Sequence, residues 1–125
     1  MGKEKLITTG VVVLILLIAS GVIFFKNTSF TVKDFPSEEV AKYIGEHSVL
    51  YVLPTCSHCK DQEDLFGANV KYLNIVDCSK IENRQKCIDA LGIGGRFPTW
   101  IINGVKYEGK KTIEELKELT GYQAK

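Results

Sequence analysis

The alternation of apolar and polar positions divides the chain into one long apolar run and a series of shorter elements after it. Residues 6–25 form twenty positions without a charged side chain, bounded by Lys5 and Lys26. A helix of that length is about 30 Å long, which matches the hydrocarbon core of a bilayer. We therefore predict a transmembrane anchor over residues 6–25, preceded by a tail at residues 1–5 and followed by a tether at residues 26–36.

A cleaved signal peptide is the alternative interpretation of the same run. The apolar part of such a peptide spans about 7–15 residues and ends at small residues, which Ala19-Ser20-Gly21 would supply. Apolar residues continue from Val22 to Phe25 beyond that point, and this favours an uncleaved anchor. Lysines flank the run on both sides, so charge alone does not decide its orientation.

From Ser37 onward, apolar positions alternate between helical and strand periodicity. The predicted helices cover residues 37–44, a segment that begins at two cysteines and ends at Gly67, residues 80–91, and a segment that begins at Thr112. The predicted strands cover residues 48–53, 70–76, 99–102 and 105–107. Gly45 and Gly92 are expected to end helices, and Asn103-Gly104 to form a hairpin turn.

The first predicted strand leads directly into two cysteines, Cys56 and Cys59. Cysteines that open a helix lie where unpaired backbone N–H groups and the helix dipole stabilise negative charge. We expect Cys56 to favour its reactive thiolate, and Cys59 to lie beneath it and to close or resolve a disulfide. His58 can be cationic near neutral pH, which would favour the thiolate and make the pair more oxidising.

Metal binding is the alternative for these cysteines. The gap from Cys59 to Cys78 has the length seen between two halves of a zinc site, but eight residues separate Cys78 from Cys87 instead of two. A carrier of copper or zinc would use Cys56, His58 and Cys59, yet the chain has a single methionine to add as a soft ligand. The pattern favours a redox pair without a metal or a dissociable cofactor.

The second cysteine pair has a different spacing. Cys78 follows a predicted strand and Cys87 lies nine residues later, in the predicted helix. A disulfide between them would require that the helix folds back over the strand end, and two separately buried thiols are the alternative. All four cysteines follow the apolar run, which suggests one working and one stapling disulfide in a domain outside the cytoplasm.

The charge of the chain argues against a nucleic-acid partner. The chain has 16 Lys and Arg against 15 Asp and Glu, a net charge of +1. The sequence shows no basic cluster of the kind that binds nucleic acid, so we predict no nucleic-acid partner.

The order of predicted elements, with the Cys-x-x-Cys segment after the first strand and Phe97-Pro98-Thr99 before the third, resembles the thioredoxin fold. This resemblance implies an α/β domain over residues 37–125, a central mixed sheet flanked by helices. It implies that Pro98 is cis and packs against the cysteine pair, although most X-Pro bonds are trans. The implied substrate-binding residues are Phe97, Pro98 and Thr99, whose backbone would pair with an extended substrate segment.

A longer set of residues is similar to the thioredoxin-like domain attached to microbial homologues of vitamin K epoxide reductase. These residues are Cys56, His58, Cys59, Asp77, Cys78, Cys87, Gly92, Ile93, Phe97 to Trp100, Ile102 to Gly104, Glu118, Leu119, Gly121 and Tyr122. The similarity implies oxidation of secreted protein thiols, reoxidation by a membrane quinone reductase, and a structural Cys78–Cys87 bridge.

The chain departs from that family in three ways. Ser57 replaces the usual proline after the first cysteine, and a single apolar run requires that the quinone reductase is a separate chain. The strand before Cys56 also lacks the buried acid of thioredoxins, which leaves water, Glu46 or His47 to assist deprotonation of Cys59. We predict a membrane-anchored disulfide donor acting outside the cytoplasm, with a thiol reductase or isomerase as the alternative.

Overall fold

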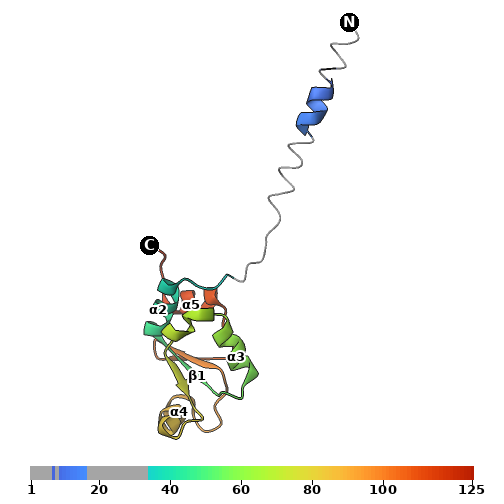
Figure 1. The fold of residues 1–125 in the computed structure, drawn as a ribbon. Coiled ribbons are helices and arrows are strands. Elements are labelled where there is room, and N and C mark those ends of the chain that lie inside the picture. Colours follow the sequence, from blue (N-terminus) through green and yellow to red (C-terminus); the bar gives the residue numbers. More distant parts are fainter. Residues whose placement is uncertain (1–6, 8, 17–33) are drawn as a thin grey trace. The chain divides into compact units, whose positions relative to one another are not determined.

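The computed structural model in Figure 1 describes residue 7, residues 9–16 and residues 34–125. The chain divides into two units, Met1–Asp34 and Phe35–Lys125. Residues 7 and 9–16 are helical, and most of the predicted anchor and tether lies outside the described residues. Within the described part of the chain, no helix combines the length and the apolar character needed to cross a bilayer.

A four-stranded mixed sheet, in the order β2-β1-β3-β4, forms the centre of the second unit. β1 (Ser48–Val52) is parallel to β2 (Ile75–Asp77) and antiparallel to β3 (Thr99–Ile102), which pairs in turn with β4 (Val105–Glu108). Because β1 has a strand on each side and is covered on both faces, it needs an almost continuous apolar sequence. The sheet and its helices fit the expected thioredoxin-like fold.

Alternate residues of the strands enter two separate cores. Leu50, Val52, Trp100 and Ile102 pack in the larger core, with side chains from α2 (Glu38–His47), α3 (Ser57–Asp64) and α5 (Ile113–Thr120). Tyr51 and Val76 pack in the smaller core against Cys87 and Leu91 of α4 (Arg84–Leu91). The period of two along a strand therefore assigns α4 to one face of the sheet and the other helices to the opposite face.

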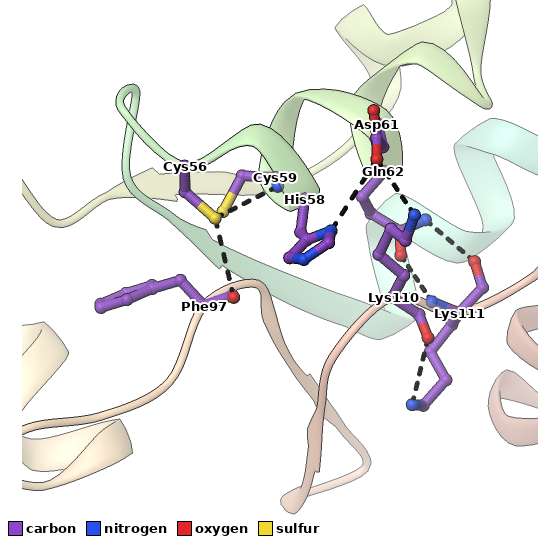
Figure 2. A network of polar contacts seen from close by, with 8 residues as sticks. All are labelled: Cys56, His58, Cys59, Asp61, Gln62, Phe97, Lys110 and Lys111. Carbon is purple, nitrogen blue, oxygen red and sulfur yellow. Dashed lines mark hydrogen bonds and ion pairs between the residues drawn. The ribbon is translucent and has the colours of Figure 1, made fainter.

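A buried glutamine ties the cysteine-bearing helix to the rest of the domain. Gln62 of α3 is fully buried and accepts hydrogen bonds from the Trp100 Nε1 atom at 3.3 Å and the Lys111 backbone N–H at 2.6 Å. Its amide donates to the Lys111 carbonyl at 3.0 Å. All of its polar groups are thus used, and they hold α3 against β3 and the segment before α5. Figure 2 shows the bonds between Gln62 and Lys111.

The prediction that Gly45 ends the first helix is wrong. α2 continues to His47, and Gly45 lies inside it at a buried position. A side chain at this position would collide with the backbone carbonyl of Tyr72, which belongs to the 3₁₀ helix η1 (Gly67–Tyr72). Gly45 therefore permits a close approach of two segments, and the sequence pattern does not distinguish this use from a helix end.

Two further predicted boundaries are corrected by the structure. The strand expected over residues 70–76 is limited to β2, because residues 70–72 belong to η1 and the Leu73 N–H donates to the Val70 carbonyl. The helix expected over residues 80–91 is split into the 3₁₀ helix η2 (Ile81–Asn83) and α4. Asn83 donates its side-chain amide to the Asp77 carbonyl at 2.9 Å, so this turn is tied to the strand end.

The helix expected to end at Gly67 ends instead at Asp64, and Gly67 begins η1, whereas other local signals are confirmed. Thr112 and Glu115 form the expected capping box at the start of α5. Gly92 ends α4 at a positive φ of 82°, with its N–H bonded to the Ile88 carbonyl. Asn103 and Gly104 both have positive φ and join β3 to β4. These features depend on neighbours within a few residues, which is why sequence patterns predict them well.

Candidate dithiol site

Cys56 is the N-cap residue of α3, at the end of the turn that follows β1. Its backbone N–H donates to the Leu53 carbonyl at 3.1 Å, and its Sγ atom accepts the Cys59 N–H at 3.4 Å (Figure 2). The sulfur therefore occupies the place of a capping oxygen, facing the unpaired N–H groups of the first helical turn. Such a position stabilises a thiolate.

The two cysteines are free thiols in unequal surroundings. Cys56 is half-buried, whereas Cys59 is 1% exposed. Burial, strengthened by a hydrogen bond with Cys56, raises the pKa of Cys59 to about 12, although a backbone hydrogen bond from Leu53 opposes this shift. Of the two thiols, Cys56 is therefore the more accessible, and Cys59 is the one that holds its proton more tightly.

The Phe97–Pro98 peptide bond is cis, and this loop lies against Cys56. The Cys56 thiol donates to the Phe97 carbonyl at 3.7 Å. Pro98 is buried and its carbonyl accepts the Gly109 N–H at 2.8 Å. Thr99 is fully buried within β3 and donates its hydroxyl to the Arg96 carbonyl at 2.6 Å. Of the three predicted substrate-binding residues, Phe97 thus bonds through its backbone carbonyl to the Cys56 sulfur.

His58 lies on the exposed side of α3. Its Nδ1 atom is 3.9 Å from the Asp61 Oδ2 atom, and that carboxylate also accepts Lys110 Nζ at 3.0 Å. Figure 2 shows the ring turned along the helix toward this pair. Among the described residues, no group of three His, Cys, Asp or Glu side chains is arranged to hold a metal ion.

The expectation that Glu46 or His47 assists Cys59 is wrong. Both residues end α2 immediately before β1, whereas the cysteines follow β1. The five residues of that strand span about 16 Å, so the two groups lie at opposite ends of it. Within α3, the half-buried acidic residue one helical turn after Cys59 is Glu63.

Cys78 and Cys87 are joined by a disulfide, with their Cα atoms 5.9 Å apart. Cys78 directly follows β2 and its N–H donates to the Val52 carbonyl at 2.9 Å, while Cys87 is buried on α4. The bridge therefore links the end of one strand to the helix that covers the smaller core.

An apolar groove of about 420 Å³ begins beside the dithiol. Leu53 and Phe97, which both contact the cysteine segment, form its near end. The far end is formed by the last turn of α4 and the glycine-rich loop after it, where Ile93 is 96% exposed. Cys78 and Cys87 also line the groove, so it runs from the two residues that bond to Cys56 across the second cysteine pair.

Comparison with known proteins supports this description. No family model matches the chain. A relative from Arabidopsis thaliana, named thiol-disulfide oxidoreductase LTO1, is 41% identical over 76 residues, which is 54% of this chain and 19% of the relative. The chain therefore matches only about a fifth of the length of that protein. The mixed sheet, the helices and this similarity fit a thioredoxin-like domain.

Proposed function

We propose that this protein is a thiol-disulfide oxidoreductase that uses Cys56 and Cys59. The observation that carries the proposal is the asymmetric pair at the start of α3, with one sulfur accessible as the helix cap and the other buried beneath it. The name of the similar plant protein states the same activity for that protein.

Disulfide donation proceeds in two exchanges. A substrate thiolate attacks Cys56 Sγ of the Cys56–Cys59 disulfide, so a mixed disulfide forms and Cys59 leaves as a thiolate. A second substrate thiolate attacks the substrate sulfur of the mixed disulfide and Cys56 leaves as a thiolate. The substrate loses two electrons, and the protein gains them as the dithiol.

The substrates in this proposal are extended thiol-containing protein segments. The backbone of Phe97 lies next to Cys56 and supplies the edge along which such a segment pairs. Side chains beside the substrate cysteine then enter the apolar groove near Leu53 and Phe97.

We place the reaction at the outer side of a membrane, with residues 6–25 as the anchor. The Cys78–Cys87 disulfide supports a compartment in which disulfides persist. The resemblance to domains attached to vitamin K epoxide reductase homologues supports reoxidation by a separate quinone reductase of that type. Membrane insertion is tested by alkaline extraction of membranes, which would release an unanchored chain.

Replacement of the nucleophile tests the activity itself. A Cys56→Ser variant of the full chain should lose all catalysed thiol oxidation of a reduced unfolded protein, measured by free-thiol titration. Lys60→Ala changes an exposed residue of the same helix, leaves both sulfurs in place, and serves as the matched control that should remain active. Full activity of Cys56→Ser would refute the proposed mechanism.

The reduction potential of the Cys56–Cys59 pair decides whether the protein acts as a disulfide donor or as a reductase. Equilibration of the full chain with glutathione should give a value near or above about −200 mV for a disulfide donor, because oxidising members of this class lie well above thioredoxin. A value near or below about −270 mV would instead assign the protein as a reductase. Ser57, in place of the usual proline, is the sequence feature that makes this measurement informative.

A further inference from the structure

A charged side chain lies in the wall of the apolar groove beside the dithiol. The groove is lined mainly by apolar side chains, glycines and the Cys78–Cys87 pair, and Arg84, the first residue of α4, is the one charged residue among the described residues that line it. A cation in apolar surroundings loses part of its hydration, and a carboxylate that pairs with it offsets this cost. The lining therefore favours an occupant that is apolar and also carries a negative charge.

Arg84 has no carboxylate partner within the described part of the chain. None of the ion pairs found there includes its guanidinium. The acidic side chains nearest to it along the chain, Glu82 and Asp89, do not line the groove, and Asp89 accepts the Gln85 side-chain amide at 2.7 Å. A guanidinium binds a carboxylate through two parallel hydrogen bonds, so Arg84 can pair with an acidic group of another molecule.

Exposed apolar side chains lie along the same groove. Ile93 is 96% exposed and Ile88 is 37% exposed, and both line it. Large apolar side chains that are grouped in water beside a groove are typical of a binding surface. An occupant that covers them buries apolar area, and this contributes to its binding independently of its charge.

The wall that carries these residues is held in place by the fold. The Cys78–Cys87 disulfide ties α4 to the end of β2. The loop after α4 packs closely on that helix, because a β-carbon added at Gly95 would lie 2.6 Å from the Leu91 Cβ atom. A preformed groove binds an extended segment at a lower entropic cost than a surface that must first be ordered.

The near end of the groove reaches the reactive cysteine. Leu53 and Phe97 line it, and their backbone carbonyls accept the N–H and the thiol of Cys56 respectively. A substrate segment whose cysteine meets Cys56 Sγ, and whose chain continues into the groove, therefore passes along α4. An acidic side chain that pairs with Arg84 then lies some residues away from the substrate cysteine, on the side that enters the groove.

We propose that the preferred substrates of the dithiol are extended protein segments with an apolar residue beside the cysteine and an acidic residue further along, whose carboxylate pairs with Arg84 in this groove. This inference rests on the proposed function, because it names the substrate class of the same site. It adds no chemical step to the two thiol-disulfide exchanges. Arg84 determines specificity: the ion pair raises kcat/KM for acidic segments, and the sulfurs alone carry out the exchange.

Oxidation of synthetic peptides by the full chain in detergent tests this assignment. The chain is first oxidised so that Cys56 and Cys59 form a disulfide. Each peptide has a single cysteine, a leucine beside it, and glutamate, glutamine or lysine at one of the successive positions on either side. Chromatography of quenched samples gives the rate of peptide oxidation. At about 0.15 M salt, the glutamate peptide of the matching position should react about tenfold faster than its lysine counterpart, because one gains an ion pair and the other meets a like charge.

Charge reversal at the arginine should invert this preference. In Arg84→Glu, the lysine peptide should react about threefold faster than the glutamate peptide. The Arg84 side chain is exposed and a glutamate in the first turn of a helix is favourable, so the variant should fold. Lys86→Glu makes the same change of charge on α4 outside the groove, and should keep the wild-type ratio within about twofold. Every variant meets the same peptides, so differences between their own thiol pKa values cancel.

The apolar part of the groove has a separate test. Ile93→Ser changes an exposed side chain and should slow the oxidation of all leucine-bearing peptides by about threefold, because less apolar area is buried in the complex. The ratio between glutamate and lysine peptides should not change in this variant. Wild-type rates in Ile93→Ser would contradict the apolar contact.

The outcomes distinguish this inference from the proposed function. Oxidation of glutamate and lysine peptides at equal rates, at every position, would overturn the role of Arg84 and leave the dithiol activity intact. An equal change of the ratio in Arg84→Glu and Lys86→Glu would also overturn that role, because it would reflect the overall charge of the domain. Failure of the wild-type chain to oxidise any peptide would overturn the dithiol activity and the role of Arg84 together.

Discussion

The two cysteine pairs of this protein have similar local positions and different chemistry. Each begins where one of the two parallel strands ends, and each has a half-buried first cysteine and a buried second one on the following helix. Cys56 and Cys59 are nevertheless free thiols, whereas Cys78 and Cys87 are joined. Burial and strand placement alone therefore do not make a redox site.

The difference lies in what each first sulfur faces. Cys56 caps α3, so its Sγ atom meets the helix N–H groups and the Phe97 carbonyl. Cys78 precedes α4 by a turn and a 3₁₀ segment, and its sulfur bonds to Cys87 in the first half of that helix. A helix start stabilises a thiolate, while a link between strand and helix stabilises the folded chain.

The strongest test of this comparison is the fate of a trapped substrate. Cys59→Ser removes the resolving thiol, so Cys56 should retain substrates as mixed disulfides that are visible on a non-reducing gel. Cys87→Ser removes the corresponding cysteine of the other pair and should trap none on Cys56. Equal trapping by the two variants would show that the pairs are functionally interchangeable.

Alkylation should sharpen the contrast within the dithiol. Because burial raises the pKa of Cys59 to about 12, its thiolate is scarce at pH 7 and iodoacetamide should modify Cys56 alone. Below pH 12, each added pH unit increases the Cys59 thiolate about tenfold, so Cys59 labelling should rise with pH. Mass spectrometry of peptides measures both sites. Equal labelling at pH 7 would contradict the assigned asymmetry.

Removal of the second disulfide should reduce stability without removing the activity. Closing a loop of nine residues contributes about 2–3 kcal/mol on the chain-entropy model. A Cys78→Ala, Cys87→Ala double variant should lose about that much free energy of unfolding in urea, and should still oxidise thiols where it remains folded. Cys56→Ser, which removes a cysteine but breaks no disulfide in this structure, is the matched control.

The smallest expected effect concerns the turn that leads into Cys78. Hydrogen bonds from the Ser79 hydroxyl and backbone N–H lower the pKa of Asp77 below its usual value. A carboxyl with a depressed folded pKa adds stability above its unfolded pKa, and that stability is lost as the pH falls through the folded pKa. Asp77→Asn should thus melt slightly lower than the wild type at pH 7 and equally at about pH 2. A constant difference across this range would reject the linkage.

Features that depend on neighbouring residues were accessible from sequence. The pattern around Cys56 predicted a cysteine at a helix start, and Thr112 with Glu115 predicted a capping box; the structure has both. The similarity to the thioredoxin fold also led to the expectation of a mixed sheet, which the strand order bears out. Local signals succeed here because a turn or a cap is stabilised by a few adjacent groups.

Features that depend on distant segments were not accessible. The close contact with Tyr72 that requires Gly45, and the position of Glu46 and His47 at the far end of β1, follow from packing between elements. The residues over 70–72 have an alternating pattern that suits a strand, yet they form part of a 3₁₀ helix. Tertiary contacts override weak local preferences of this kind.

The sequence by itself determined the position of Cys56 and Cys59 at a helix start and the order of elements, because these depend on residue type and short-range spacing. Only the tertiary structure decided how completely Cys59 is buried, how alternate strand residues divide between two cores, and which residues line the groove near Leu53 and Phe97. Burial and proximity across the sheet are properties of packed elements. They set the pKa of a thiol, and the order of residues along the chain does not reveal them.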